Sequence, residues 1–287
     1  MTDSARAIPR SILYTPALSL NQVVKALSYD ADVHLMDLED SVPGPAKAQA
    51  RVICRTVLDT ATQCACIAVR INALGTVDAL HDLVMLSAGQ ATPGFIVMSM
   101  VKSPAEVIFL RETLACAGKH PEIYLTIETV EAIADLDNLS AVADGLIFGS
   151  ADLAATLGVK ITWLGMLAAR QAMVLASARY RIGCVDTANF RLSEPAVLAN
   201  EIQCVKDLGF HGKATVHPSE LELINASLRP NKDELLAASQ ISDAVADAHG
   251  EVALLDGNMV GPPFARMAHN TLRSSKAWAE RFVRGNS

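Results

Sequence analysis

The chain has 287 residues, of which 51% are hydrophobic, 5% aromatic and 19% charged, and its formal net charge at pH 7 is -7. This composition allows a sizeable core built mainly from aliphatic side chains, as in parallel sheets covered by helices, and it excludes disorder over most of the length. An acidic chain without a clustered stripe of lysine and arginine does not match a nucleic-acid binder.

Short aliphatic runs alternate with amphipathic stretches of helical length over most of the chain. The runs predict eight strands, at residues 11–15, 32–38, 66–71, 94–99, 122–127, 145–149, 181–185 and 213–216. The stretches predict helices between them, at residues 19–29, 45–59, 76–88, 103–117, 130–141, 151–157, 163–179, 194–207 and 218–226. This alternation is typical of α/β proteins with a parallel sheet, and eight strands is the number that closes a (β/α)8 TIM barrel.

The pattern changes after Pro230. Residues 231–249 and 266–284 are expected to form two helices, joined by the segment 251–263, which is punctuated by glycine and proline and contains no further strand of barrel type. We therefore divide the chain into a (β/α)8 barrel catalytic domain at residues 1–230 and a C-terminal helical extension at residues 231–287.

The cysteines and the start of the chain indicate the compartment. Six cysteines occur without a CxxC pair or a histidine at zinc-ligand spacing, so most are expected to be small buried hydrophobes. Residues 1–10 are polar and lack the apolar stretch of a secretory signal, and no uncharged apolar run reaches about 18 residues. These features predict a soluble, cytoplasmic protein that does not cross a membrane.

Charged side chains stand at the ends of four predicted strands: Glu39, Arg70, Glu128 and Asp152. Because the carboxyl ends of all strands of a TIM barrel meet at one rim, where such enzymes keep their active sites, the four are expected to lie together. An acid at the end of a buried strand is costly unless it is paired or bound to a cation. The rim is therefore expected to hold a metal or a substrate.

Glu128 and Asp152 offer oxygen ligands with no softer partner nearby, which suits a hard cation such as Mg²⁺. Helix capping by two acids near helix starts explains them equally well. Arg70, at the end of an apolar run, suits a substrate carboxylate or a developing oxyanion. The alternative is a structural ion pair with Glu39 or Asp40.

Three further candidates have simpler explanations. Strand alternation places Asp37 and Glu39 on one side of the second strand and Asp40 on the other, so these acids are expected to serve different purposes. Lys47 lies near the same rim, although a solvated helix face accounts for it as well. His217 follows the eighth strand, where it contacts either substrate or backbone.

These residues lie in segments that resemble, in order, the motifs of the citrate lyase beta subunit-like family, which includes malyl-CoA and citramalyl-CoA lyases. The resemblance covers about residues 10–225, and its segments are Arg10-Ser11-Ile12-Leu13-Tyr14-Thr15-Pro16, Asp37-Leu38-Glu39-Asp40-Ser41 with Lys47 and Arg51, Val69-Arg70-Ile71-Asn72, Ile127-Glu128-Thr129, Phe148-Gly149-Ser150-Ala151-Asp152-Leu153 and Gly212-Lys213-Ala214-Thr215-Val216-His217-Pro218. The resemblance implies a TIM barrel, usually in a homotrimer, with Mg²⁺ as cofactor and an acyl-CoA thioester as substrate.

The resemblance also implies roles for individual residues. Glu128 and Asp152 match the carboxylates that bind Mg²⁺, and Arg70 matches the residue that grips the oxygenated substrate. Glu39 and Asp40 match family residues that position metal-bound water or neighbouring groups. Arg10 and Lys47 match family positions near the CoA or pantetheine arm. Many relatives carry an aspartate where this chain has Gly261, so the group that protonates the enolate is left unassigned.

The reaction that the resemblance implies is cleavage of a 3-hydroxy-3-carboxy acyl-CoA to acetyl-CoA and an α-keto acid. Citramalyl-CoA, which yields pyruvate, is slightly favoured over malyl-CoA. The alternatives are a citrate lyase beta subunit acting on citryl-acyl carrier protein, and a metal-dependent aldolase that acts on free hydroxy-keto acids without CoA.

Overall fold

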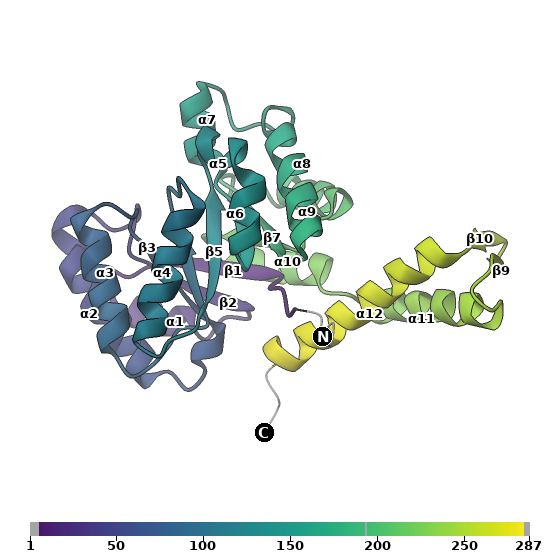
Figure 1. Ribbon diagram of the computed structural model, residues 1–287, viewed down its shortest axis with the longest axis horizontal. Helices are drawn as coiled ribbons and strands as arrows, with labels where there is room; N and C mark the ends of the chain where they lie inside the picture. Colours follow the sequence, from purple (N-terminus) through teal and green to yellow (C-terminus); the bar gives the residue numbers. More distant parts are fainter. Residues whose placement is uncertain (1–5, 193, 284–287) are drawn as a thin grey trace. The chain divides into compact units, whose positions relative to one another are not determined.

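A closed barrel of eight parallel strands forms the larger part of this computed structural model, which describes residues 6–192 and 194–283 (Figure 1). Each strand pairs with its neighbours in chain order, and β1 pairs with β8 to close the sheet. The strands are β1 (Ser11–Pro16), β2 (Val33–Asp37), β3 (Ile67–Ile71), β4 (Phe95–Met98), β5 (Glu122–Ile127), β6 (Gly145–Phe148), β7 (Gly183–Asp186) and β8 (Gly212–Thr215). The predicted α/β TIM barrel is therefore confirmed.

Helices follow the strands and cover the outer surface of the sheet (Figure 1). They are α1 (Leu20–Ala26), α2 (Lys47–Thr60), α3 (Val77–Ala88), α4 (Pro104–Cys116), α5 (Val130–Ala134), α6 (Leu136–Val142), α7 (Ser150–Leu157), α8 (Trp163–Tyr180), α9 (Pro195–Leu208) and α10 (Leu221–Leu228). Several begin at a side-chain cap; Thr129, for example, accepts a hydrogen bond from the backbone N–H of Ala132. The caps therefore begin these helices shortly after the preceding strand ends, at the rim of the barrel.

The prediction of one continuous helix at residues 130–141 is wrong in one detail. The structure breaks this stretch at Asp135, which ends α5 and begins α6 with φ -105° and ψ 21°. The apolar spacing continues across the break, so the period alone did not reveal it.

Strand alternation decides which side chains face the interior of the barrel. Outward-facing residues such as Met36, Val69 and Phe148 belong to the large apolar core between the sheet and its helices. Their neighbours on each strand point the other way. Since Asp37 pairs with Arg70 in the register of β2 and β3, both reach the interior at the same height.

The described residues separate into two compact units, one within residues 9–225 and the other formed by residues 226–283 with 6–8. The sequence placed the boundary after residue 230. In the smaller unit, α11 (Lys232–Asp247) packs along α12 (Pro262–Phe282), and α11 begins with a capping box between Asn231 and Glu234.

The connection between α11 and α12 differs from the predicted loop. It contains an antiparallel hairpin of β9 (Ala253–Leu255) and β10 (Asn258–Val260). Asp256 and Gly257 form its turn with φ of 48° and 79°, the left-handed values that two-residue hairpin turns need. The second helix begins at Pro262, not at residue 266, because proline fits the first turn of a helix. Over the described residues, no helix has the length and apolar character needed to span a membrane.

Candidate active site

Four carboxylates and one arginine lie together at the carboxyl end of the barrel. We call Asp37, Glu39, Glu128 and Asp152 the acid cluster; Asp37 ends β2, Glu39 follows it, Glu128 follows β5, and Asp152 lies in the first turn of α7. Arg70 of β3 contacts two of the acids, and the charges of Glu39, Asp152 and Arg70 all act on Glu128. The four strand-end residues singled out in the sequence are thus brought together.

Arg70 is held by Asp37 through two parallel hydrogen bonds. Arg70 Nε donates to Asp37 Oδ1 at 2.7 Å and Nη2 donates to Oδ2 at 2.6 Å. Burial alone would raise the pKa of Asp37, but the hydrogen bonds and charge of Arg70, with a hydrogen bond from Ser41, hold it below its usual value. The guanidinium is therefore fixed in one orientation, with Nη1 left for another partner.

Glu39 is the partner of this remaining nitrogen of Arg70. Its Oε2 lies 3.1 Å from Arg70 Nη1 as an ion pair, but it accepts no hydrogen bond from any described residue. Burial is the main cause that raises the pKa of Glu39. The charge of Asp40 raises this pKa further, and the charge of Arg70 opposes the rise. Asp40 itself is exposed, as the strand alternation predicted.

Glu128 is the most deeply confined acid that faces this site without a counter-ion of its own. Only 2% of it is exposed, and its Oε1 accepts a 2.6 Å hydrogen bond from the backbone N–H of Met100. Met100 has φ 50°, so a strained backbone aims this donor at the carboxylate. Burial, followed by the charges of Glu39 and Asp152, raises the pKa of Glu128 to about 8.

Gly149 leaves the space that the Glu128 side chain occupies. A Cβ atom at Gly149 would lie 2.8 Å from Glu128 Oε2 and would also meet the side chain of Thr126. The absence of a side chain at the end of β6 therefore lets Glu128 approach the start of α7, where Asp152 lies.

This donor set fits a hard divalent cation. The oxygens of Glu128 and Asp152 are the ligand type that Mg²⁺ prefers. The pKa of Glu128 is raised first by burial and then by the negative charges of Glu39 and Asp152, which a cation would neutralise. Within residues 6–192 and 194–283, no group of three or more His, Cys, Asp or Glu side chains is arranged for metal binding. Two carboxylates remain compatible with Mg²⁺, which usually keeps several water ligands.

Tyr14 is a site residue that the sequence did not single out. Its ring lies 5.3 Å from the guanidinium carbon of Arg70. It is partly exposed although it belongs to an interior position of β1, and the charges of Arg70, Asp37, Glu128 and Glu39 act on its phenol. An aromatic residue in a strand is usually packing material, so only the fold could reveal this position.

Arg10 does not reach the acid cluster. Its backbone N–H donates to Asp32 and its Nη1 donates to the carbonyl oxygen of His211, two residues that precede β2 and β8. Asp37 pairs with Pro16 at the other end of β1. Pro16 is six residues after Arg10, which corresponds to about 20 Å of extended chain. Arg10 therefore lies at the end of the barrel opposite the acid cluster, and its contact with the CoA arm stays a prediction.

Lys47 and His217 have local partners. Lys47 Nζ donates to the carbonyl oxygens of Leu38 and Glu39 at 2.9 and 3.1 Å and to Asn72 Oδ1 at 2.5 Å, which uses all three of its protons. Lys47 thus anchors the loop that carries Glu39, and its place near the CoA arm stays a prediction. His217 bonds to Ser219, in agreement with the simpler of its two interpretations.

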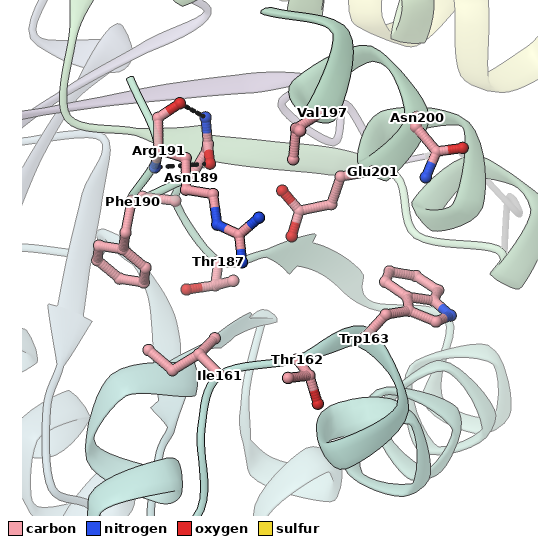
Figure 2. Close-up of a pocket in the computed structure, with 11 residues that line it drawn as sticks. Ile161, Thr162, Trp163, Thr187, Asn189, Phe190, Arg191, Val197, Asn200 and Glu201 are labelled. Atoms are coloured by element: carbon pink, nitrogen blue, oxygen red, sulfur yellow. Dashed lines mark hydrogen bonds between the residues drawn. The ribbon is translucent and has the colours of Figure 1, made fainter. Parts of the chain in front are cut away.

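A cavity of about 400 Å³ opens between the start of α8, the segment that follows β7, and α9 (Figure 2). Its wall combines apolar and aromatic side chains with the guanidinium of Arg191, and includes Ile161, Trp163, Phe190 and Val197. Thr187 also lines it and bonds through Oγ1 to Ser150 Oγ at 3.0 Å. None of the four acid-cluster residues lines this cavity; the Thr187–Ser150 hydrogen bond links its wall to the start of the helix that carries Asp152.

A second group of charges joins β7 and β8 to helices α8 and α9, and we call it the paired network: Arg170, Asp186, Glu201 and Lys213. Asp186 accepts from Arg170 Nε at 2.8 Å and from Lys213 Nζ at 2.9 Å. The second acid, Glu201, lies 3.5 Å from Arg170 and 3.4 Å from Lys213. Two cations here face two anions, so the charges compensate each other.

Comparison with known proteins agrees with this geometry. Residues 10–218 match the family model described as HpcH/HpaI aldolase/citrate lyase. The (3S)-malyl-CoA thioesterase of Cereibacter sphaeroides is 30% identical over 278 residues, which cover 94% of this chain and 95% of the relative. Mitochondrial citramalyl-CoA lyase of Homo sapiens is 24% identical over 286 residues, covering 92% and 84% of the two chains.

Among solved structures, the protein CitE from Mycobacterium tuberculosis, in complex with magnesium, acetoacetate and coenzyme A, is similar over 94% of this chain and 99% of its own. The TM-score is 0.79 and the sequence identity is 26%. Both units of the chain are therefore represented in the match, and the structures share the barrel fold.

Proposed function

The chain belongs to the HpcH/HpaI aldolase/citrate lyase family, and we propose that it is a Mg²⁺-dependent carbon–carbon lyase that cleaves a 3-hydroxy-3-carboxy acyl-CoA to acetyl-CoA and an α-keto acid. The relatives named as citramalyl-CoA lyase and malyl-CoA thioesterase act on CoA thioesters of this type. The solved relative that holds magnesium and coenzyme A supports the same cofactor and the same carrier.

The observation that carries this proposal is the uncompensated charge around Glu128. This side chain is nearly inaccessible and lies within the fields of Glu39 and Asp152, while Arg70 is already bound to Asp37 and Glu39. Such an arrangement disfavours its ionised form unless a cation binds. Glu128 and Asp152 are therefore the residues that would hold Mg²⁺.

The bound ion would supply Lewis-acid stabilisation of oxygen charge on the substrate. The chain supplies the remaining groups. Arg70, fixed by Asp37, directs a guanidinium at the oxygen that becomes the keto group, and Glu39 takes the proton of the substrate hydroxyl because its raised pKa makes it a stronger base than an ordinary glutamate. Asp40 assists through its charge on Glu39.

Citramalyl-CoA, which yields pyruvate, is the favoured substrate. Malyl-CoA and citryl thioesters differ from it only in the group at the third carbon, where a methyl needs an apolar wall, a hydrogen needs little room and a carboxymethyl needs another cation. The malyl-CoA thioesterase that is 30% identical gives one specific alternative, hydrolysis of the thioester without carbon–carbon cleavage.

A thioester panel tests the proposal. Citramalyl-, malyl- and citryl-CoA are each incubated with the isolated chain and Mg²⁺, then with EDTA, while acetyl-CoA, α-keto acid and free CoA are measured separately. We expect acetyl-CoA and pyruvate from citramalyl-CoA, with loss of the reaction in EDTA. Free CoA without keto acid would instead establish a thioesterase.

Two other outcomes of the panel would replace the proposal. Turnover of free hydroxy-keto acids with no measurable CoA binding would establish a CoA-independent aldolase. Activity that appears only after citryl-acyl carrier protein is supplied would establish a citrate lyase beta subunit. The homotrimer and the cytoplasmic location implied by the sequence stay predictions, and light scattering measures the first.

A further inference from the structure

The cleavage proposed above ends with a thioester enolate that must gain a proton. We propose that the hydroxyl of Tyr14 donates that proton to the methylene carbon and so completes acetyl-CoA. This inference rests on the proposed function and assigns a catalytic residue to its last step.

The fold turns Tyr14 toward the barrel interior. Its neighbour Leu13 packs outward in a small core cluster with Ala26, Ala31 and Leu221. Because successive side chains of a strand point to opposite faces, Tyr14 points inward. It occupies the strand next to β2, two residues before the level at which Pro16 pairs with Asp37.

The surrounding charges locate the phenol within the acid cluster. The guanidinium of Arg70 lies 5.3 Å from its ring centre. The charges that act on the phenol are those of Arg70, then Asp37, Glu128 and Glu39, which come from three different strand ends. The phenol therefore lies among the groups that bind the substrate and the cation in the proposed reaction.

The hydroxyl is also available to a ligand. Tyr14 is partly exposed, unlike its strand neighbours Leu13 and Thr15, which are buried. Nothing in the described part of the chain forms a hydrogen bond with its oxygen. A tyrosine hydroxyl normally finds a hydrogen-bond partner when it lies inside a protein, so an open hydroxyl at an accessible interior position suits a substrate contact.

Its protonation state suits a donor. Burial is the main cause that raises the pKa of Tyr14 above its usual value. The charge of Arg70 opposes this rise, and the nearby carboxylates add to it. The phenol therefore stays protonated throughout the physiological range, and a phenol remains far more acidic than the methyl group of a thioester.

Atoms and electrons balance in this step. When the bond between the second and third carbons of the acyl chain breaks, its electron pair stays with the methylene carbon as an enolate. That carbon forms a bond to the Tyr14 proton, and the electron pair of the broken O–H bond remains on the phenolate beside Arg70. The phenolate then regains the proton that Glu39 took from the substrate hydroxyl, so no external acid is consumed.

The experiment compares wild type with Tyr14→Phe, which removes only the hydroxyl. Tyr180→Phe is the matched control, because its hydroxyl contacts Asp137 on the outer helices. Cleavage of citramalyl-CoA is measured with Mg²⁺, and in D₂O solvent the exchange of the methyl protons of acetyl-CoA is followed by mass spectrometry in the presence of pyruvate. Binding of CoA by calorimetry and far-ultraviolet circular dichroism report on the integrity of each variant.

For Tyr14→Phe we expect kcat to fall by about 100- to 10,000-fold, the range typical of a lost general acid. Methyl exchange should fall in parallel, while KM, CoA binding and the dichroism spectrum stay within threefold of wild type. Tyr180→Phe should match wild type in every measurement.

The outcomes separate this inference from the proposed function. Wild-type cleavage together with a kcat and an exchange rate within threefold for Tyr14→Phe would overturn the assignment of Tyr14 and leave the lyase proposal standing. A rise in KM without a loss of exchange would also overturn it, because it would show a binding role. A wild-type chain that cleaves no thioester would overturn both.

Discussion

The acid cluster and the paired network belong to one barrel, but their charges are arranged in opposite ways. The paired network places two cations against two anions, and three of its members are nearly inaccessible: Arg170, Asp186 and Lys213. In the acid cluster, Arg70 pairs with Asp37 and Glu39, while Glu128 has the charges of Glu39 and Asp152 beside it and no ion pair among the described residues.

The difference shows in the pKa values of the acids. Burial would raise the pKa of Asp186, yet Lys213 and Arg170 lower it below its usual value. For Glu128 burial is not compensated, and the pKa rises to about 8. A compensated buried group is consistent with a structural role, whereas an uncompensated one is typical of a site that completes its charge with a ligand.

The largest effect is expected from breaking the paired network. Lys213→Met leaves Asp186 buried with one of its cations removed, and the free energy of unfolding should fall by about 3–5 kcal/mol. Denaturant unfolding measures this change. Lys276→Met is the control, since that side chain is 79% exposed and should change stability by less than about 0.5 kcal/mol. A loss below about 1 kcal/mol for Lys213→Met would contradict the structural role.

In the acid cluster, Arg70→Lys keeps the charge but loses the parallel pair of hydrogen bonds to Asp37. We expect kcat for thioester cleavage to fall by about 100- to 1,000-fold, as when one oxyanion donor is removed. Arg111→Lys, at an exposed ion pair with Asp144, serves as control. Unchanged turnover in Arg70→Lys would remove the guanidinium from the mechanism. Arg70→Ala is less informative because it also leaves Asp37 buried and unpaired.

Glu128→Gln should have opposite effects with and without metal. The folded pKa of Glu128 lies above its ordinary value of 4.5, so its contribution to stability without metal is lost as pH rises from about 4.5 to about 8. At pH 8 the metal-free variant should therefore be more stable than metal-free wild type by roughly 1–3 kcal/mol. Thermal unfolding at pH 5 and pH 8 tests this, and a variant less stable at pH 8 would refute the uncompensated charge.

The smallest effect is expected at Gly149. In Gly149→Ala the new Cβ must displace Glu128, which should weaken Mg²⁺ binding by roughly tenfold and cost about 1–2 kcal/mol of stability. Gly44→Ala is the matched control because a Cβ there meets no atom within 4 Å. Equal Mg²⁺ affinity in both variants would show that the space at Gly149 does not position Glu128.

The barrel could be predicted from sequence because each strand is a short aliphatic run followed by a helical period, and the closed sheet then brings Glu39, Arg70, Glu128 and Asp152 to one rim. The hairpin in the C-terminal unit was missed although Asp256-Gly257 is a typical turn pair. The start of α12 was placed too late because Pro262 was interpreted as a helix breaker.

Parts of the site could not be predicted because they depend on three-dimensional contacts. The first strand predicted at residues 11–15 already placed Arg10 before it, but only the structure shows its contact with the carbonyl oxygen of His211. Lys47 looked available for a ligand until its three acceptors were known. The backbone donor of Met100 and the open hydroxyl of Tyr14 leave no pattern in the sequence.

The most direct test of the account is a calorimetric titration of the wild-type chain with Mg²⁺ at several pH values, repeated with Glu128→Gln and Asp152→Asn. In wild type, Mg²⁺ affinity should rise by up to about tenfold per pH unit between pH 6 and pH 8, because Glu128 must lose a proton whose pKa is about 8 before the ion binds. Glu128→Gln should bind Mg²⁺ weakly and without that pH dependence, whereas Asp152→Asn should bind Mg²⁺ weakly but keep a pH dependence, because Glu128 is still present and buried. Wild-type binding that is absent, or that is equally strong in both variants, would contradict the account.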